Sequence, residues 1–359
     1  MLFGIAAAMT TTTTSQKSID LTVLKARLEK KSGHDCSHPD IAGQSRNYRL
    51  YTVIMEEHDK VLVRVYWPYM ADGLGGVSCA GGLYSEISTL RFLQKEDLTI
   101  CAPRPVCYDD DLDGRVGGAW IATVFIEGTL LSKKLATLTN VQSYLVRQSM
   151  KEIYIKILKS AGTNFNEIGS IRAVGNTAAA TCRHPECSED AKDRQFFIGP
   201  MSLSPSNETG VTSPPRPTDT GPFETGEQWL LAVTCQHLEY FGSLRRAEPT
   251  QAAVHLQCKV LEQIYEAAEI IRERPTTDLV LEHVNFSADN ILIAPDNPVK
   301  IVGILGWAGA RVVPFWGTER EGDDELVTEF ELSEGTCSWD DEDLSRLAWR
   351  ARNWHIVEP

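Results

Sequence analysis

The stretch between residues 279 and 307, LVLEHVNFSADNILIAPDNPVKIVGILGW, constrains the fold more than any other part of the chain. Its apolar runs are Leu279–Leu281, Ile291–Ile293 and Val299–Leu305, each too short for a helix. The residues PDNP at 295–298 are typical of a turn between the last two runs. The pattern therefore predicts a short strand, a loop from His283 to Asn290, and a β-hairpin that ends just before Trp307.

The chain before about residue 127 is predicted to be a β-rich section with one helix. Strand-like runs lie at 48–55, 61–66 and 119–126, and a turn-like EEHDK separates the first two. Glycines at 73, 75, 76, 81 and 82 predict a loop, which leads into a helix around Ser85–Gln94.

The section after residue 127 is predicted to be mainly helical. Asn140–Ser160 is a long helical candidate, and the apolar residues of Ala252–Arg272 fall on one face of a helix that Pro275 ends. Between these two helices lies a segment rich in Pro, Ser, Thr and Gly (173–227), which predicts a surface loop.

The formal net charge of −14 argues against a nucleic-acid or anionic-membrane partner, because both select clustered Lys and Arg. The charge is unevenly distributed, since twelve acidic residues between Gly317 and Ser345 stand against Arg320 alone. This run is either a solvated acidic loop or a docking surface for a basic partner.

Cysteine usage and the N-terminus indicate the compartment. The nine cysteines are irregularly spaced and do not form a disulfide framework, so we expect a reducing compartment, the cytoplasm. The start, MLFGIAAAM, lacks the basic region of a signal peptide, and Met9 could equally be the first residue. No stretch approaches the 18 apolar residues of a membrane span.

The segment at 279–307 resembles the catalytic segment of aminoglycoside and choline phosphotransferases. In that family a loop of the form H-G-D-x-x-x-x-N-I-L precedes a hairpin that ends in I-D-W, and here His283 and Asn290 have the same separation. Upstream, VLVRV (61–65) resembles the strand that carries a phosphate-contacting cation, and SEISTLRFL (85–93) resembles the helix whose acid pairs with it. The triplets IGS, IGP and GPF (168–170, 198–200 and 221–223) recur in fungal versions of the family.

The resemblance spans about residues 40–316 and implies an α+β, bilobal protein-kinase-like fold that transfers phosphate from ATP with Mg²⁺. It places Asn285 at the position of the catalytic base and gives His283 a structural role in the same loop. The other implied roles are nucleotide binding for Gly43, Arg64 and Glu86, and metal binding at the positions of Asn290 and Gly306.

Two of these positions depart from the family pattern. The base position is Asn285, and an amide cannot take up the proton of an acceptor hydroxyl at neutral pH. The position of the metal-binding acid before Trp307 is Gly306, which has no side chain to ligate Mg²⁺. The neighbouring acids do not replace them: Glu282 is expected to face the other side of its strand, and Asp289 to point away if Asn290 points in.

We therefore predict a disordered N-terminus at 1–18, an N-lobe at 19–127, a C-lobe at 128–316 and an acidic C-terminal segment at 317–359. The expected function is that of a catalytically impaired, kinase-like protein that serves as a nucleotide-binding or regulatory module. One alternative is an active ATP- and Mg²⁺-dependent phosphotransferase that acts on a small-molecule hydroxyl, and another is a decaying gene product with no retained activity. The expected partners are a nucleotide and a small-molecule acceptor, with no nucleic acid and no membrane.

Overall fold

The computed structural model describes residues 18–44, 48–56, 59–66, 75–96, 100–111, 113–174, 195–201, 220–232, 265 and 279–315. The elements with defined bounds include the helices α1 (Leu21–Ser32), α2 (Gly75–Lys95) and α3 (Asn140–Ser160). The strands of the first half are β1 (Asp40–Gln44), β2 (Tyr48–Met55), β3 (Asp59–Tyr66), β4 (Pro105–Asp109), β5 (Trp120–Val124) and β6 (Thr129–Leu130). Those of the second half are β7 (Ser170–Ala173), β8 (Phe196–Gly199), β9 (Leu279–Glu282), β10 (Ile291–Ile293), β11 (Ile301–Ile304) and β12 (Arg311–Pro314).

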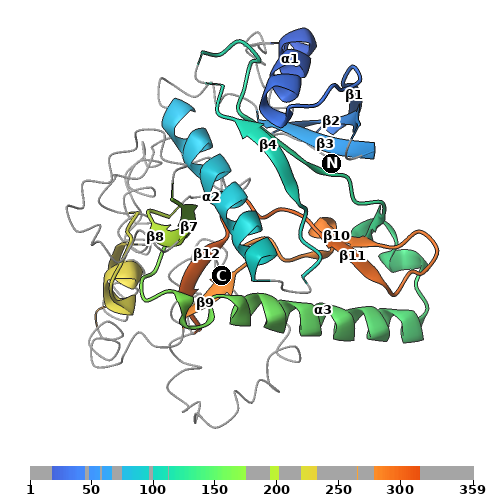
Figure 1. The fold of residues 1–359 in the computed structure, drawn as a ribbon. Helices are drawn as coiled ribbons and strands as arrows, with labels where there is room; N and C mark the ends of the chain where they lie inside the picture. The colour runs from blue at the N-terminus through green and yellow to red at the C-terminus, as the bar shows by residue number, and fades with distance from the viewer. Residues whose placement is uncertain are drawn as a thin grey trace, which may run out of the picture.

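An antiparallel sheet in the order β1-β2-β3-β5-β4 forms the N-terminal part of the molecule. Alternate residues of its strands point to opposite faces, and one face carries buried side chains such as Tyr51, Val53 and Val63. Helix α1 covers this face with Leu24 and Leu28, and Figure 1 shows it at the outer end of the sheet. The predicted strands at 48–55 and 61–66 are confirmed, the second beginning two residues earlier, at Asp59.

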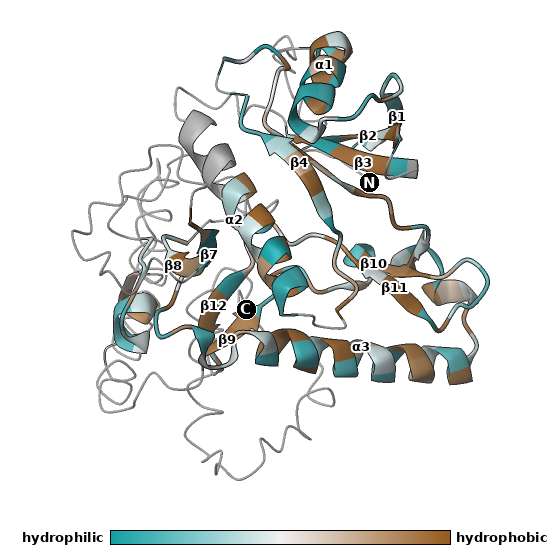
Figure 2. Cartoon of the chain, viewed as in Figure 1, coloured by the Kyte–Doolittle hydropathy of each residue, from teal (hydrophilic) through white to brown (hydrophobic). Residues whose placement is uncertain are grey.

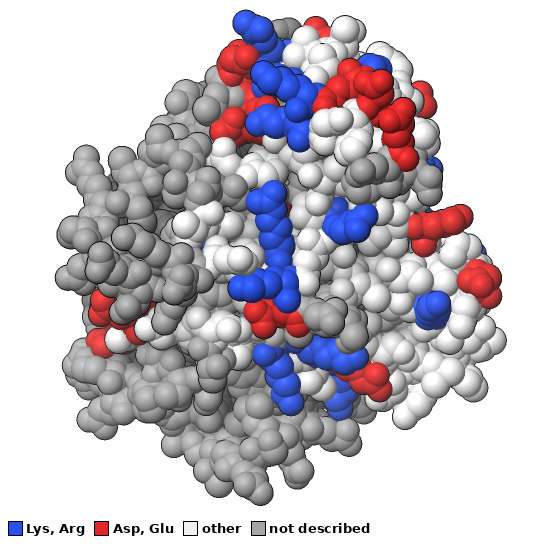
Figure 3. All heavy atoms as spheres, in the orientation of Figure 1, with Lys and Arg blue, Asp and Glu red and all other residues white. Residues whose placement is uncertain are grey.

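A buried carboxylate joins α1 to the sheet. Asp111 accepts hydrogen bonds from the backbone N–H groups of Val116, Gly117 and Gly118 at 3.0, 2.8 and 2.8 Å. Its Oδ1 also lies 3.3 Å from Nη1 of Arg27, which projects from α1. Acidic and basic side chains adjoin over α1 on the surface, as Figure 3 shows.

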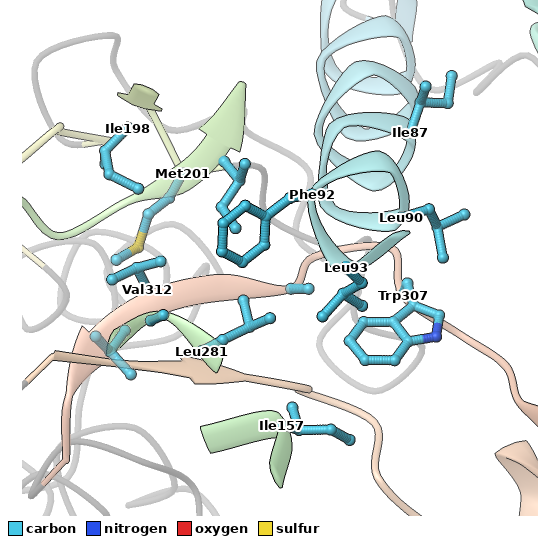
Figure 4. Packing of buried hydrophobic residues seen from close by; sticks show 14 of the residues in the cluster. Ile87, Leu90, Phe92, Leu93, Ile157, Ile198, Met201, Leu281, Trp307 and Val312 are labelled. Atoms are coloured by element: carbon cyan, nitrogen blue, oxygen red, sulfur yellow. The ribbon is translucent and has the colours of Figure 1, made fainter. Parts of the chain in front are cut away.

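Helix α2 corrects one prediction, because the glycine-rich stretch from residue 75 onward is helical rather than a loop. Each glycine weakens a helix by about 1 kcal/mol relative to Ala. The later turns offset this by burying Leu83, Ile87 and Leu90 in the main core, where α2 packs against the C-terminal part of the chain. Figure 4 shows Leu90 and Leu93 of α2 beside Trp307.

The described residues of the C-terminal part form three small antiparallel sheets. Their orders are β11-β10-β6, β12-β9 and β7-β8. The strands β9, β10, β11 and β12 are buried over most of their length and mainly apolar (Figure 2), and α3 lies along β9. The predicted helix Asn140–Ser160 is confirmed with the same bounds, as are the strand Ile291–Ile293 and the hairpin that follows it.

The chain therefore has an α+β fold in which a β-rich N-terminal part packs through α2 on a C-terminal part. Within the described ranges no helix is long and apolar enough to cross a membrane. The predicted helix at 252–272 lies outside these ranges except for residue 265, as do residues 1–17, 317–359 and most of 173–227. The boundaries of the lobes remain predictions.

We expect Asp111→Ala to lower the free energy of unfolding by about 3 kcal/mol, because it leaves three buried N–H groups without their acceptor and removes one of the carboxylates that Arg27 contacts. Asp113→Ala is the matched control. It also removes an Arg27 partner, but the Asp113 side chain is 47% exposed, so its loss should destabilise the protein much less. Urea denaturation measures both, and equal losses would contradict the central role of Asp111.

Candidate functional site

The loop from His283 to Asn290 connects β9 to β10 and is compact. The Phe286 N–H donates to the His283 carbonyl at 3.2 Å, and the Asn290 N–H donates to the Ser287 carbonyl at 2.9 Å. Residues Ala288–Asn290 form a short 3-10 turn that leads directly into β10. The loop begins and ends on buried strands, and this fixes both of its ends.

His283 is a buried structural residue of this loop. Its Nε2 lies 2.9 Å from the Leu305 carbonyl, and its ring stands edge-on to Trp307 with centroids 4.5 Å apart. Burial lowers the pKa of His283 to about 4, although the hydrogen bond to Leu305 opposes this shift. The imidazole is therefore neutral near pH 7, and Nε2 donates to Leu305.

Asn285, Asn290 and Gly306, three of the predicted site residues, lie together. The Asn290 Nδ2 donates to the backbone carbonyl of Asn285 at 2.9 Å. Gly306 has a left-handed φ of +82°, and a Cβ added there would lie 2.8 Å from Oδ1 of Asn290. The Asn290 amide thus packs against the space that a side chain at position 306 would need, while the Asn285 side chain is exposed.

The acids beside the loop point elsewhere, as the sequence led us to expect. Glu282 is buried and pairs with Arg311 on β12, with Oε2 and Nε 2.6 Å apart. Asp289 is exposed to solvent. Within the described part of the chain, no group of three or more His, Cys, Asp and Glu side chains could hold a metal ion.

Arg64 and Glu86 form an ion pair between β3 and α2. Glu86 is 2% exposed, and its Oε1 contacts Nη2 of Arg64. The second carboxylate oxygen, Oε2, accepts a hydrogen bond of 2.6 Å from the Tyr66 hydroxyl. The Arg64 guanidinium lies 5.1 Å from the ring centroid of Tyr66 and 5.6 Å from that of Tyr48. Burial disfavours its charge, but Glu86 outweighs burial and raises the pKa of Arg64.

The ion pair and the loop belong to one region. Glu86 is near enough for its negative charge to raise the pKa of His283, against the larger effect of burial. Trp307, next to Gly306, packs in the same core as Ile87 and Leu90, which follow Glu86 on α2. The tertiary structure therefore packs the helix that carries Glu86 and the tryptophan that follows Gly306 in one core.

Gly43 is placed differently from the prediction. It lies within β1, paired with Leu50 after a β-bulge, and not in a turn. A Cβ there would make an ordinary contact of 3.7 Å with Leu50, so neither space nor backbone conformation requires glycine. The connection at 45–47 lies outside the described residues, and a role for Gly43 in nucleotide binding remains a prediction.

Sequence reasoning missed three contributors to this region. Tyr66 follows Arg64 by two residues and so shares its face of β3, which the period of a strand could have revealed. Arg311 forms an ion pair with Glu282, and Leu305 contributes its backbone carbonyl to His283. No local sequence pattern indicates either contact.

No family model matches the chain. Two curated proteins, both called "Altered inheritance of mitochondria protein 9, mitochondrial", are similar to parts of it. The one from Candida tropicalis is 28% identical over 167 residues, which cover 44% of this chain and 26% of that protein. The one from Candida albicans is 29% identical over 134 residues, which cover 36% of this chain and 20% of that protein. The matched stretches thus span about a quarter of these relatives or less.

Solved structures of phosphotransferases are similar in arrangement. Aminoglycoside phosphotransferase APH(4)-Ia has a TM-score of 0.49 with 14% identity, covering 82% of this chain and 74% of that one. A putative fructosamine-3-kinase from Thermobifida fusca has a TM-score of 0.42 with 15% identity, covering 94% and 85%.

The chain's own elements have the arrangement of a kinase-like fold. These are the antiparallel sheet, the ion pair from its third strand to α2, and the loop followed by a hairpin.

We expect stability to fall as the pH is lowered from 6.5 towards 4, because of His283. In this window the unfolded chain binds a proton on His283 and the folded chain does not, so protonation favours unfolding by about 3 kcal/mol in total. His283→Gln should reduce the pH dependence in urea denaturation. An unchanged pH profile in this variant would show that other groups cause it.

Gly306→Ala should lower the free energy of unfolding by about 1–3 kcal/mol, because Ala is strained at positive φ and its Cβ meets the Asn290 amide. Gly82→Ala in α2 is the matched control. It has open space around the added Cβ and should be neutral or stabilise by up to about 1 kcal/mol. Thermal melts distinguish the two, and a neutral Gly306→Ala would contradict the packing described above.

Proposed function

We propose that this chain is an aminoglycoside-phosphotransferase-like protein that binds nucleotide phosphates through Arg64 and is impaired in phosphoryl transfer. The observation that carries the proposal is the arrangement of Asn285, Asn290 and Gly306. The Asn290 amide bonds the Asn285 carbonyl and packs on Gly306, where the family pattern has a carboxylate.

The impairment follows from proton transfer. A substrate hydroxyl that attacks a phosphate must lose its proton, and a positioned base accelerates such steps by about 10²–10⁴. Asn285 is an amide and cannot act as this base. Because Glu282 is paired with Arg311 and Asp289 is exposed, neither neighbouring acid takes over its position.

The donors around the loop do not fit Mg²⁺. This ion prefers negatively charged oxygen ligands in an octahedral arrangement, and it binds ATP together with one or two carboxylates. Here the two family positions offer one neutral amide oxygen, that of Asn290, and a glycine without a side chain. We therefore expect nucleotide binding that does not depend on Mg²⁺.

Arg64 supports the binding half of the proposal. It is a permanent cation on β3, and the ion pair with Glu86 fixes its position. A nucleotide-binding protein with this cation and without catalysis would serve as a regulatory module. The cytoplasmic location stays a prediction, and the names of the two Candida relatives contain "mitochondrial".

The alternative is an active phosphotransferase acting on a small-molecule hydroxyl. The intact pair of Arg64 and Glu86 favours it, because such pairs hold phosphates for transfer. In this case Asn285 would position the acceptor, Asn290 would contact the metal, and ATP with Mg²⁺ would be required.

Binding of ATP should occur with similar affinity in the presence of Mg²⁺ and in the presence of EDTA, measured by isothermal titration calorimetry. Arg64→Ala should weaken it at least about tenfold, equivalent to about 1.4 kcal/mol, because a desolvated cation contact to phosphate is lost. Arg49→Ala is the matched control. Leu50 of β2 pairs with Arg64, and Arg49, the residue before Leu50, points to the opposite face of the sheet. Absence of ATP binding would refute the binding half of the proposal.

Turnover of ATP should be absent with any acceptor of a panel of amino sugars and small alcohols. Asn285→Asp combined with Gly306→Asp tests the cause, since turnover gained by this variant would locate the defect at the two positions. Mg²⁺-dependent turnover by the unmodified chain would instead establish the active alternative.

A further inference from the structure

The ion pair between Arg64 and Glu86 has an unusual geometry. Arginine and a carboxylate commonly form two parallel hydrogen bonds, one to each oxygen. Here Arg64 contacts Oε1 of Glu86, while the Tyr66 hydroxyl occupies Oε2 at 2.6 Å. The carboxylate is thus shared between a guanidinium and a phenol.

Sharing the carboxylate leaves donors of Arg64 for other partners. A guanidinium has five N–H donors, and only a bond from Nη2 to Glu86 is present within the described residues. The Nε is buried and has no hydrogen-bond partner in this part of the chain. An unpartnered buried donor costs free energy that an anionic ligand could recover.

Tyr66 is held firmly in this position. Its backbone N–H donates to the Ala119 carbonyl at 2.8 Å, and its own carbonyl lies against Gly118, where an added Cβ would come within 2.0 Å of it. Gly118 is in turn bonded to Asp111. Burial also raises the pKa of Tyr66 well above its ordinary value, so the phenol keeps the proton that it donates.

We propose that Tyr66 is a positioning residue, which keeps Arg64 on one oxygen of Glu86 so that its remaining donors can bind nucleotide phosphates. This inference rests on the proposed nucleotide binding and adds the group that orients the cation. Without the hydroxyl, Arg64 can take both oxygens of Glu86 and turn its donors away from a ligand. The Tyr66 ring, 5.1 Å from the guanidinium, would still contact it in Tyr66→Phe.

The test compares ATP with adenosine, because only ATP carries the phosphates that Arg64 would bind. Affinities of both for the full chain are measured by calorimetry in the unmodified protein and in Tyr66→Phe. We expect the ATP affinity to fall about tenfold and the adenosine affinity to stay unchanged. A general loss of structure would lower both affinities, so the ratio separates positioning from folding.

Tyr84→Phe is the matched control. It removes a hydroxyl on α2 that donates to the Asp110 carboxylate, and not to Glu86, at the same distance of 2.6 Å. Its ratio of ATP to adenosine affinity should equal that of the unmodified chain. If Tyr66→Phe leaves the ratio unchanged while ATP binding still depends on Arg64, the inference is wrong and the proposed function stands. If the unmodified chain binds no ATP, both fail.

A crystal structure of Tyr66→Phe provides a test that needs no ligand. The inference requires that Arg64 contacts both oxygens of Glu86 in the variant. An Arg64 side chain that remains on Oε1 alone would overturn it, whatever the binding data show.

Discussion

One residue holds both ends of the loop on which the candidate site depends. The Leu305 N–H donates to the Asn290 carbonyl at 2.7 Å, and the Leu305 carbonyl accepts from Nε2 of His283 at 2.9 Å. Because His283 begins the loop and Asn290 ends it, the residue after β11 fixes the whole loop against the hairpin. The next residue, Gly306, lies against Asn290. Position 306, where the family pattern has a metal-binding acid, is therefore beside the loop.

Phosphotransferases combine phosphate binding with activation of a hydroxyl, and this region has groups for the first function only. A cation of the kind that binds phosphates is present, since Arg64 is charged, partly buried and paired with Glu86, which also accepts a hydrogen bond from Tyr66. The anionic oxygens that activate a hydroxyl and hold Mg²⁺ are absent from positions 285 and 306. Electrostatics therefore favours an anionic ligand here without supplying the charges for chemistry, which is why we propose binding rather than turnover.

Stability and binding are linked through a chain of contacts that starts far from the loop. Asp111 binds the backbone around Gly118, Gly118 packs on the Tyr66 carbonyl, and the Tyr66 hydroxyl reaches Glu86. These contacts connect the attachment of α1 to the Glu86 carboxylate that Arg64 and Tyr66 share. Buried hydrogen-bond networks of this kind are costly to leave partly satisfied, so they hold one geometry.

The sequence by itself determined the elements with strong local patterns and the residue types at the site. The helix Asn140–Ser160 and the strand Ile291–Ile293 follow from apolar periodicity, and an amide at 285 and a glycine at 306 rule out carboxylates there. The helical state of residues 75–82 was decided by tertiary structure, because packing of the later turns of α2 outweighs the low helix propensity of glycine. Tertiary structure also decided that Gly43 lies in a strand, that Glu282 is neutralised by Arg311, and that Tyr66 shares Glu86 with Arg64. These contacts join residues distant in sequence, and a local pattern carries no information about which distant group will neutralise a charge or accept a proton.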